Sequence, residues 1–137
     1  MRIVIAPAAY KGTVSASDAA IAIAARLSDH PCVLMPMADG GDGTLDVLLA
    51  HGFAPMSVGC VDAIGRPRTA RIGMRGREAV IELAEICGIA HLDHLAPMTA
   101  SSRGVGMAIG AALDAGAREI TLAIGGSAST DAGTGML

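Results

Sequence analysis

Aromatic residues are almost absent from this sequence, which contains one tyrosine (Tyr10), one phenylalanine (Phe53) and no tryptophan. Single-stranded nucleic acids are commonly bound by stacking bases on aromatic rings, so we do not expect that mode of recognition here. The formal net charge is −3, and the arginines are scattered rather than gathered in a basic stripe. Nucleic acid is therefore a poor candidate for a partner. The core must be built from aliphatic residues and from the eight methionines.

Paired cysteines and long apolar runs are also missing. Cys32, Cys60 and Cys87 are odd in number and form no C-x-x-C pair, which predicts reduced thiols rather than a disulfide framework. No apolar run reaches the roughly 18 residues of a membrane span, and no signal-peptide pattern precedes the first predicted strand. We expect a soluble cytoplasmic protein. With 52% hydrophobic residues, the 137-residue chain should fold as one modest domain or as part of a larger one.

The first part of the chain predicts two strand-loop-helix units. Residues 2–6 form a short apolar run that ends at a proline, and the spacing Ser15-x-x-Asp18 is typical of a capping box at the start of a helix. Residues 32–37 form a second apolar run, followed by a helix expected from about Thr44 to Gly52. Two such units in succession favour an α/β fold with a parallel sheet.

The middle of the chain has the pattern of strands rather than of strand-loop-helix units. Segments 56–61 and 69–74 predict strands joined across Gly65-Arg66-Pro67, and the run AVIELA at 79–84 predicts a third, so we expect a β-meander or hairpin insertion. Residues 85–99 have no clear pattern beyond one possible helical turn.

The last third predicts one more helix and strand. A helix capped by Ser101 or Ser102 should run to Ala115 and end at Gly116, and residues 120–124 predict a further buried strand. The chain then ends inside a loop where another helix is expected, so we expect it to be incomplete.

Polar loops follow three of the predicted strands, and ligands of open α/β sheets bind at the carboxyl ends of strands. The first loop contains Lys11, the only lysine, followed by Gly12. A lysine here could contact a phosphate or carboxylate, with the glycine allowing close approach of the backbone. An ordinary solvated lysine explains the position equally well.

The second loop, MADGGDGT, contains two carboxylates, Asp39 and Asp42, separated by Gly40 and Gly41. Either carboxylate could bind Mg²⁺ or accept a proton from an attacking hydroxyl, and Thr44 with nearby N–H groups would suit an anion. A helix cap and a simple turn are the alternative explanation. We favour a functional loop, because D-G-G-D-G is denser in acids and glycines than a cap requires.

The third loop follows residues 120–124 and offers flexible backbone, hydroxyl groups and one carboxylate for an anion-binding nest. It is not a Walker A loop, because no lysine lies near it. Its candidate binding residues are Gly125, Gly126, Ser127, Thr130 and Asp131.

Two weaker groups complete the candidates. Arg103, after Ser101 and Ser102, could bind a carboxylate, although close helix packing also explains the neighbouring glycines. Cys87, His91, Asp93 and His94 are near one another in sequence, but they match neither a zinc-finger nor an H-E-x-x-H spacing, so surface histidines are the preferred explanation. A Rossmann dehydrogenase ranks last, since no G-x-G-x-x-G follows the first strand.

Taken together, the motifs resemble the bacterial glycerate kinase family of the type that forms 2-phosphoglycerate. The resemblance covers nearly the whole chain, and its motifs stand in family order: IAP with KG, MADGGDGT, IGRP, TASSRG, AALDAGAREI and IGGSASTDAGTGM. It implies a two-domain α/β enzyme with a Rossmann-like parallel sheet, in which residues 1–85 belong to the first domain with its strand-rich extension. Residues 86–137 would begin the second domain.

The resemblance also implies the ligands, namely ATP with Mg²⁺ and D-glycerate. Phosphoryl transfer depends on positioning and charge neutralisation, which lysines, carboxylates and phosphate-binding loops provide. Lys11 would contact phosphate or the glycerate carboxylate, and Asp39 and Asp42 would serve as Mg²⁺ ligand and candidate base. Ser101, Ser102 and the loop from Gly125 to Asp131 would bind substrate or nucleotide phosphates.

The sequence departs from the family pattern at several points. Ala8, Ala9 and Tyr10 stand where the family often has Asp-Ser-Phe, which removes a carboxylate and a hydroxyl from the first loop. Thr130 and Ala132 replace an asparagine and a glycine. The chain is also much shorter, so we expect exposed apolar faces and little kinase activity on its own. The rival hypothesis is a non-catalytic fragment that binds a nucleotide or a sugar acid.

Overall fold

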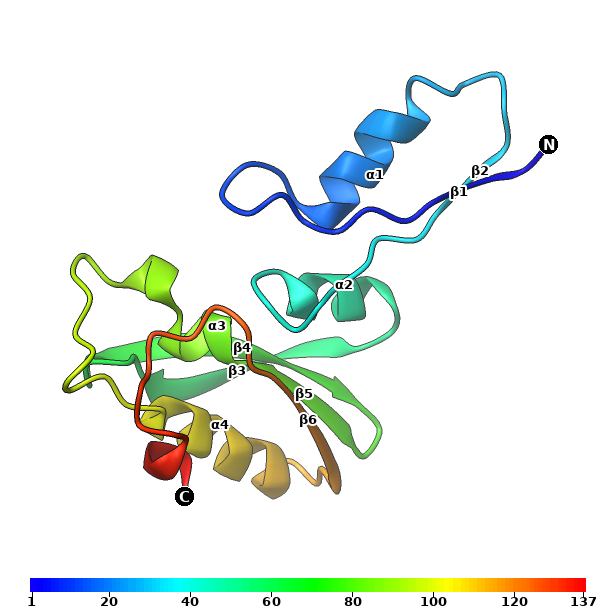
Figure 1. The fold of residues 1–137 in the computed structure, drawn as a ribbon. Helices are drawn as coiled ribbons and strands as arrows, with labels where there is room; N and C mark the ends of the chain where they lie inside the picture. Colours follow the sequence, from blue (N-terminus) through cyan, green and yellow to red (C-terminus); the bar gives the residue numbers. More distant parts are fainter.

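The computed structural model describes residues 1–137 as a mixed α/β fold with two sheets. In the smaller sheet, β1 (Ile3–Ile5) pairs in parallel with β2 (Cys32–Leu34). The connecting helix α1 (Ala16–Ala24) packs against both strands (Figure 1). This is the first strand-loop-helix unit that the sequence predicts.

The predicted N-cap of α1 is confirmed, although the reciprocal backbone bond of a full capping box is not formed. Ser15 is the N-cap, and its hydroxyl oxygen accepts a hydrogen bond from the backbone N–H of Asp18 at 3.0 Å. The same hydroxyl donates to the Asp18 carboxylate at 2.7 Å. One of the unpaired N–H groups at the start of the helix is thereby satisfied, which is why this spacing marks a helix start.

The larger sheet contains β3 (Ala54–Val61), β4 (Pro67–Arg75), β5 (Glu78–Glu82) and β6 (Glu119–Ala123), in that spatial order. The first three strands form the predicted antiparallel meander. β6 then pairs in parallel with β5 after a long crossover that contains α3 (Leu83–Cys87), the 3₁₀ turn η1 (Ile89–His91) and α4 (Arg103–Asp114).

One expectation needs correction, and another stays a prediction. The strand predicted for 79–84 ends at Glu82, and α3 begins at Leu83, inside the apolar run. Buried residues continue from the strand into this short helix, so the hydrophobic pattern carries no mark of the change. The pairing of β5 with β6 also joins strands from both sides of residue 85 in one sheet, while the division into domains at that point stays a prediction.

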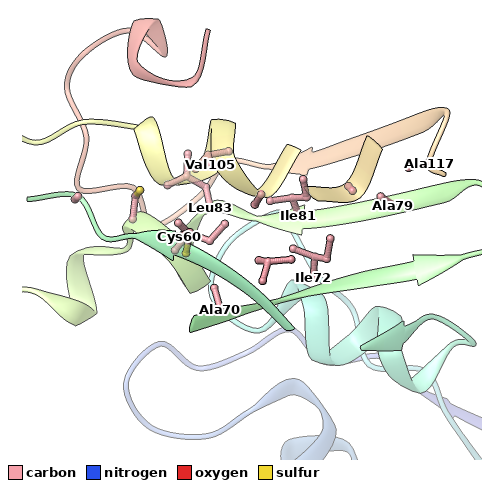
Figure 2. Close-up of a cluster of buried hydrophobic side chains, with 14 of the residues drawn as sticks. Cys60, Ala70, Ile72, Ala79, Ile81, Leu83, Val105 and Ala117 are labelled. Atoms are coloured by element: carbon pink, nitrogen blue, oxygen red, sulfur yellow. The ribbon is translucent and has the colours of Figure 1, made fainter. Parts of the chain in front are cut away.

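The main core lies between one face of the larger sheet and α4. Figure 2 shows Ile72, Ile81 and Cys60 from the sheet meeting Val105 from α4 in this core. Small residues allow α4 to approach closely, since a Cβ atom at Gly106 would lie 2.6 Å from the carbonyl oxygen of Met136 in the 3₁₀ turn η2 (Thr134–Met136). A Cβ atom at Gly104 would likewise clash with Val61 C=O of β3, so close packing accounts for Gly104 and Gly106.

Helix α2 (Thr44–Ala50) lies on the other face of the larger sheet, between it and the β1–β2 unit (Figure 1). Its buried Leu45 packs against Gly73 of β4. The smaller sheet is less covered, since Val4 is 57% and Leu34 42% exposed, which agrees with the expected exposed apolar face. None of the helices is long and apolar enough to cross a membrane.

Candidate functional site

The three polar loops meet around one cavity of about 600 Å³. Residues 8–17, which follow β1 and enter α1, form one side. The other side is formed by most of the segment 37–47, which follows β2 and enters α2. Gly125 and Gly126, which follow β6, complete the lining. The loops therefore converge although their strands belong to two different sheets.

Lys11 and Asp42 face each other in this cavity. The Lys11 Nζ atom lies 3.6 Å from Asp42 Oδ2, and the two side chains are 79% and 45% exposed. An ion pair this exposed adds little to stability, typically about 0–1 kcal/mol. Both charges therefore remain accessible to a ligand, as a functional pair requires.

The second loop, residues 37–44 and called the acidic loop from here on, has a backbone fixed by several hydrogen bonds. The Asp39 carboxylate accepts a hydrogen bond from Gly41 N–H at 3.0 Å, which closes an Asx turn. The Thr44 hydroxyl accepts from Gly40 N–H at 3.1 Å and donates to Gly41 C=O at 2.8 Å. Thr44 is buried and lies outside the cavity lining, so its hydrogen bonds stabilise the loop without contributing to the cavity wall.

The glycines of the third loop permit close contact with the second. Gly125 N–H donates to Gly40 C=O at 2.7 Å, and a Cβ atom at Gly125 would lie only 2.6 Å from the Cα atom of Gly41. A Cβ atom at Gly126 would lie 3.2 Å from an Asp42 carboxylate oxygen. No larger residue fits at Gly125 without moving one loop away from the other.

Ser101, Ser102 and Asp131 form a separate cluster at the start of α4. One Asp131 carboxylate oxygen accepts from Ser101 Oγ at 3.1 Å, from Ser102 N–H at 2.7 Å, from Ser102 Oγ at 2.9 Å and from Gly135 N–H at 3.1 Å. These bonds, led by that from Ser102 N–H, lower the pKa of Asp131 to about 2. The cluster joins the third loop to α4 and lies outside the cavity lining.

The remaining candidates also lie outside the cavity lining. The Ser127 hydroxyl is 2.8 Å from that of Ser129, the Thr130 hydroxyl donates to Pro97 C=O, and Arg103 N–H donates to Ser101 Oγ at 3.2 Å.

No group of three or more histidine, cysteine, aspartate or glutamate side chains is placed to hold a metal ion. Cys87 is fully buried, and burial raises the pKa of its thiol to about 11. Asp93 pairs with Arg66 at 3.7 Å. His91 and His94 are exposed, which agrees with the surface histidines that the sequence favoured.

Glu82 is a residue of the site that the sequence reasoning missed. Its carboxylate is buried and accepts from Gly43 N–H at 3.0 Å and from Leu45 N–H at 2.7 Å. The available signal was a single charge inside the apolar run AVIELA. Buried charges are rare unless they are paired or hydrogen-bonded, so such a residue indicates a specific partner elsewhere in the chain.

Arg71 of β4 is a second missed residue. It donates to both Glu85 carboxylate oxygens, at 2.8 and 3.3 Å, and to Asp46 of α2 at 3.0 Å. Burial opposes the charge of Glu85, but the hydrogen bonds and the positive charge of Arg71 together outweigh it and lower the pKa of Glu85. Asp46 lines the cavity, so Arg71 holds one wall of the site against the sheet.

Comparison with known proteins gives one family throughout. The sequence model of the glycerate kinase family matches residues 3–137. A glycerate kinase of Bacillus subtilis (strain 168) is 42% identical to the chain, and a glycerate 2-kinase of Escherichia coli (strain K12) is 37% identical. Each alignment includes 100% of this chain and 38% of the relative.

A solved structure agrees with these relatives. The crystal structure of a glycerate kinase 2 from Salmonella typhimurium LT2 superimposes on 99% of this chain with a TM-score of 0.80 and 36% sequence identity. The match includes 39% of that protein. The chain thus spans about 38% of the length of the curated relatives that it matches.

Proposed function

Because this chain belongs to the glycerate kinase family, we propose that it carries part of the site that transfers the γ-phosphate of ATP to D-glycerate, forming 2-phosphoglycerate. The observation that carries the proposal is the cavity in which Lys11 faces Asp42 between three strand-end loops. Phosphoryl transfer requires mainly positioning and neutralisation of negative charge. A cation opposite carboxylates, surrounded by exposed backbone, supplies these requirements.

Each group in the cavity has a proposed role. Lys11 binds a phosphate or the glycerate carboxylate as a point charge. Of the two acids, one accepts the proton of the attacking glycerate hydroxyl and the other binds the metal ion. The backbone of Gly12, Gly41, Gly125 and Gly126 allows phosphate oxygens to approach closely.

The donor set of the cavity fits Mg²⁺. This ion prefers oxygen ligands and is usually held by one or two carboxylates together with substrate phosphates and water. Asp39 and Asp42 both line the cavity and supply two carboxylates within one loop. When bound there, Mg²⁺ would neutralise phosphate charge.

Ser101, Ser102 and Asp131 have a supporting role in this proposal. Their hydrogen bonds to one another join the third loop to α4, and Gly125 of that loop bonds to the acidic loop. The position of Gly125 beside Gly41 thus depends on the third loop, whose other end is fixed by the hydrogen bonds of Asp131 to Ser102.

The rival proposal is a fragment that binds ATP or glycerate without transferring phosphate. The observation in its favour is that the chain spans about 38% of the length of its relatives, so more than half of each relative lies outside the aligned part. Binding and transfer must therefore be measured separately.

Isothermal titration of the 137-residue chain with ATP–Mg²⁺ and with D-glycerate tests the site. We expect Lys11→Met to weaken binding at least tenfold, because the cavity loses its cation. The matched control is Arg26→Met, which removes an exposed cation outside the cavity. Equal binding by the Lys11→Met variant and the parent chain would contradict the proposed role of the lysine.

Phosphate transfer is then measured with radiolabelled ATP, and the Bacillus subtilis relative serves as the active reference. We expect far slower transfer by the 137-residue chain than by the reference. Binding of both ligands with no detectable transfer would favour the rival proposal.

We also propose a cytoplasmic location. All three cysteines are free thiols, and Cys60 and Cys87 are buried. Free thiols are typical of reducing compartments.

A further inference from the structure

Glu82 occupies the junction between β5 and α3. It is the last residue of the strand and the N-cap of the following helix, and only 4% of the residue is exposed. Its carboxylate makes no capping hydrogen bond to α3. The side chain instead reaches a loop about 40 residues away in the sequence, where it accepts from Gly43 N–H and Leu45 N–H.

Helix α2 needs this contact because it has no side-chain cap of its own. Its N-cap is Gly43, whose φ of 87° lies in the left-handed region that glycine adopts without strain. A glycine has no side chain with which to accept the N–H groups of the first turn. Since buried N–H groups without partners are costly, an acceptor must come from elsewhere, and Glu82 provides both oxygens.

The two N–H groups bound by Glu82 come just after the functional part of the loop in the sequence. Gly43 directly follows Asp42, whose carboxylate lies 3.6 Å from Lys11 and beside Gly126. At the other end of the loop, Gly40 C=O accepts from Gly125 N–H at 2.7 Å. Asp42 thus lies between one anchor to β5 and one anchor to the third loop.

We propose that Glu82 is the positioning residue of the acidic loop: its buried carboxylate replaces the missing cap of α2 and thereby fixes Asp42 opposite Lys11 and the loop beside Gly125. What Asp42 does there rests on the proposed function. That Glu82 fixes the loop rests on the hydrogen bonds alone.

Two opposing effects act on the charge of Glu82. Burial raises the pKa of Glu82, and the nearby carboxylates of Glu85 on α3 and Asp42 on the loop raise it further. The two N–H groups act in the opposite direction and stabilise the ionised form. The pKa of Glu82 stays above its ordinary value, so the two donors offset only part of the cost of burial, and the contact itself is shown by the two hydrogen bonds.

The test uses Glu82→Gln in the 137-residue chain, with Glu78→Gln as the matched control. Glutamine keeps the volume, but its NH₂ group would face one of the two N–H donors and leave that donor without a partner. Glu78 lies at the other end of β5 and pairs on the surface with Arg75 at 2.7 Å. Amide hydrogen exchange is followed by NMR.

For Glu82→Gln we expect about tenfold faster exchange at Gly43 and Leu45, comparable to the loss of a helix cap. Gly125 N–H, which belongs to the other loop, should also exchange faster, because its acceptor Gly40 moves. Amides in the β3–β4 pairing should keep their rates, which distinguishes positioning from a general loss of stability.

Three results would overturn the inference. The first is unchanged exchange at Gly43 and Leu45, and the second is faster exchange there with an unchanged Gly125, which would make Glu82 a local cap only. The third comes from the parent chain, in case the variant does not fold. There the Gly43 and Leu45 amide shifts should move together as one carboxyl group titrates above the ordinary glutamate range, and independent or absent movement would refute the contact.

Ligand titration separates this inference from the proposed function. Weaker binding of ATP–Mg²⁺ or D-glycerate by Glu82→Gln than by Glu78→Gln is the expected result. If the parent chain binds neither ligand, the proposed function fails, while the exchange rates still decide the role of Glu82.

Discussion

Ala132 offers a direct test of the backbone of the third loop. It is the only residue other than glycine with a positive φ, at 52°. The left-handed region costs a residue with a Cβ atom about 1–2 kcal/mol, and glycine avoids that cost. The sequence resemblance predicted a glycine-permissive position here, and the dihedral angle agrees with that prediction.

The expected gain from Ala132→Gly follows from two opposing terms. Removing the strain stabilises the folded chain by about 1–2 kcal/mol, while the added freedom of glycine in the unfolded chain costs about 0.4–1 kcal/mol. The centres of the two ranges leave a net stabilisation of about 0.8 kcal/mol. With a urea m-value of about 2 kcal/mol/M, the midpoint of unfolding should rise by about 0.4 M.

Ala115→Gly is the matched control. Ala115 is also an exposed alanine near the end of an element, but its φ of −75° is right-handed. Glycine has no strain to relieve at that position, so the midpoint should fall. A midpoint for Ala132→Gly that falls together with that of Ala115→Gly would refute the argument from strain at Ala132.

Two further variants test the contacts between loops. Asp131→Asn should destabilise the chain by about 1.5–3 kcal/mol at pH 7, the usual contribution of hydrogen bonds to a charged group, as measured by urea unfolding. Because the pKa of Asp131 falls from 3.8 to about 2 on folding, its contribution is complete above about pH 4 and is lost as the pH falls toward 2, so parent and variant should converge there. Gly125→Ala should cost about 1–3 kcal/mol through overpacking and weaken ligand binding. Gly110→Ala in α4, where a Cβ atom would meet nothing within 4 Å, should instead stabilise the chain by about 0.5–1 kcal/mol. Equal effects of the two glycine variants would contradict the predicted contact between the second and third loops.

Local sequence signals predicted the elements that depend on local chemistry. Ser15 caps α1, and Gly52 and Gly116 follow α2 and α4 with φ values of 97° each. These residues mark ends because they satisfy or terminate the backbone within a few positions. The meander was likewise predictable, since its strands are joined by turns at Gly65 and Gly76.

Pairings between distant segments were not predictable in the same way. The parallel partner of β6 is β5, and about 40 residues separate the two strands. The switch from β5 to α3 at Leu83 falls within a run that is buried in both elements, so periodicity does not mark it. Position after a strand predicted that Lys11, Asp42 and Gly125 lie together, and all three line one cavity. Only the family resemblance grouped Ser101 and Ser102 with them, and these two serines bond to Asp131 outside the cavity lining.

The acidic loop links the two sheets, and its contacts predict that the site and the sheets respond separately to mutation. Lys11 belongs to the β1–β2 unit, and Met37 N–H bonds to Pro7 C=O within that unit at 2.9 Å. From Gly40 onward, the loop is held by contacts to the other side, through Gly125 and Glu82. The distance between Lys11 and Asp42 is therefore set where two independently paired sheets meet, rather than inside either core. A substitution at an anchor should alter ligand binding before it alters the protection of the central strands, and a substitution in the main core should do the reverse.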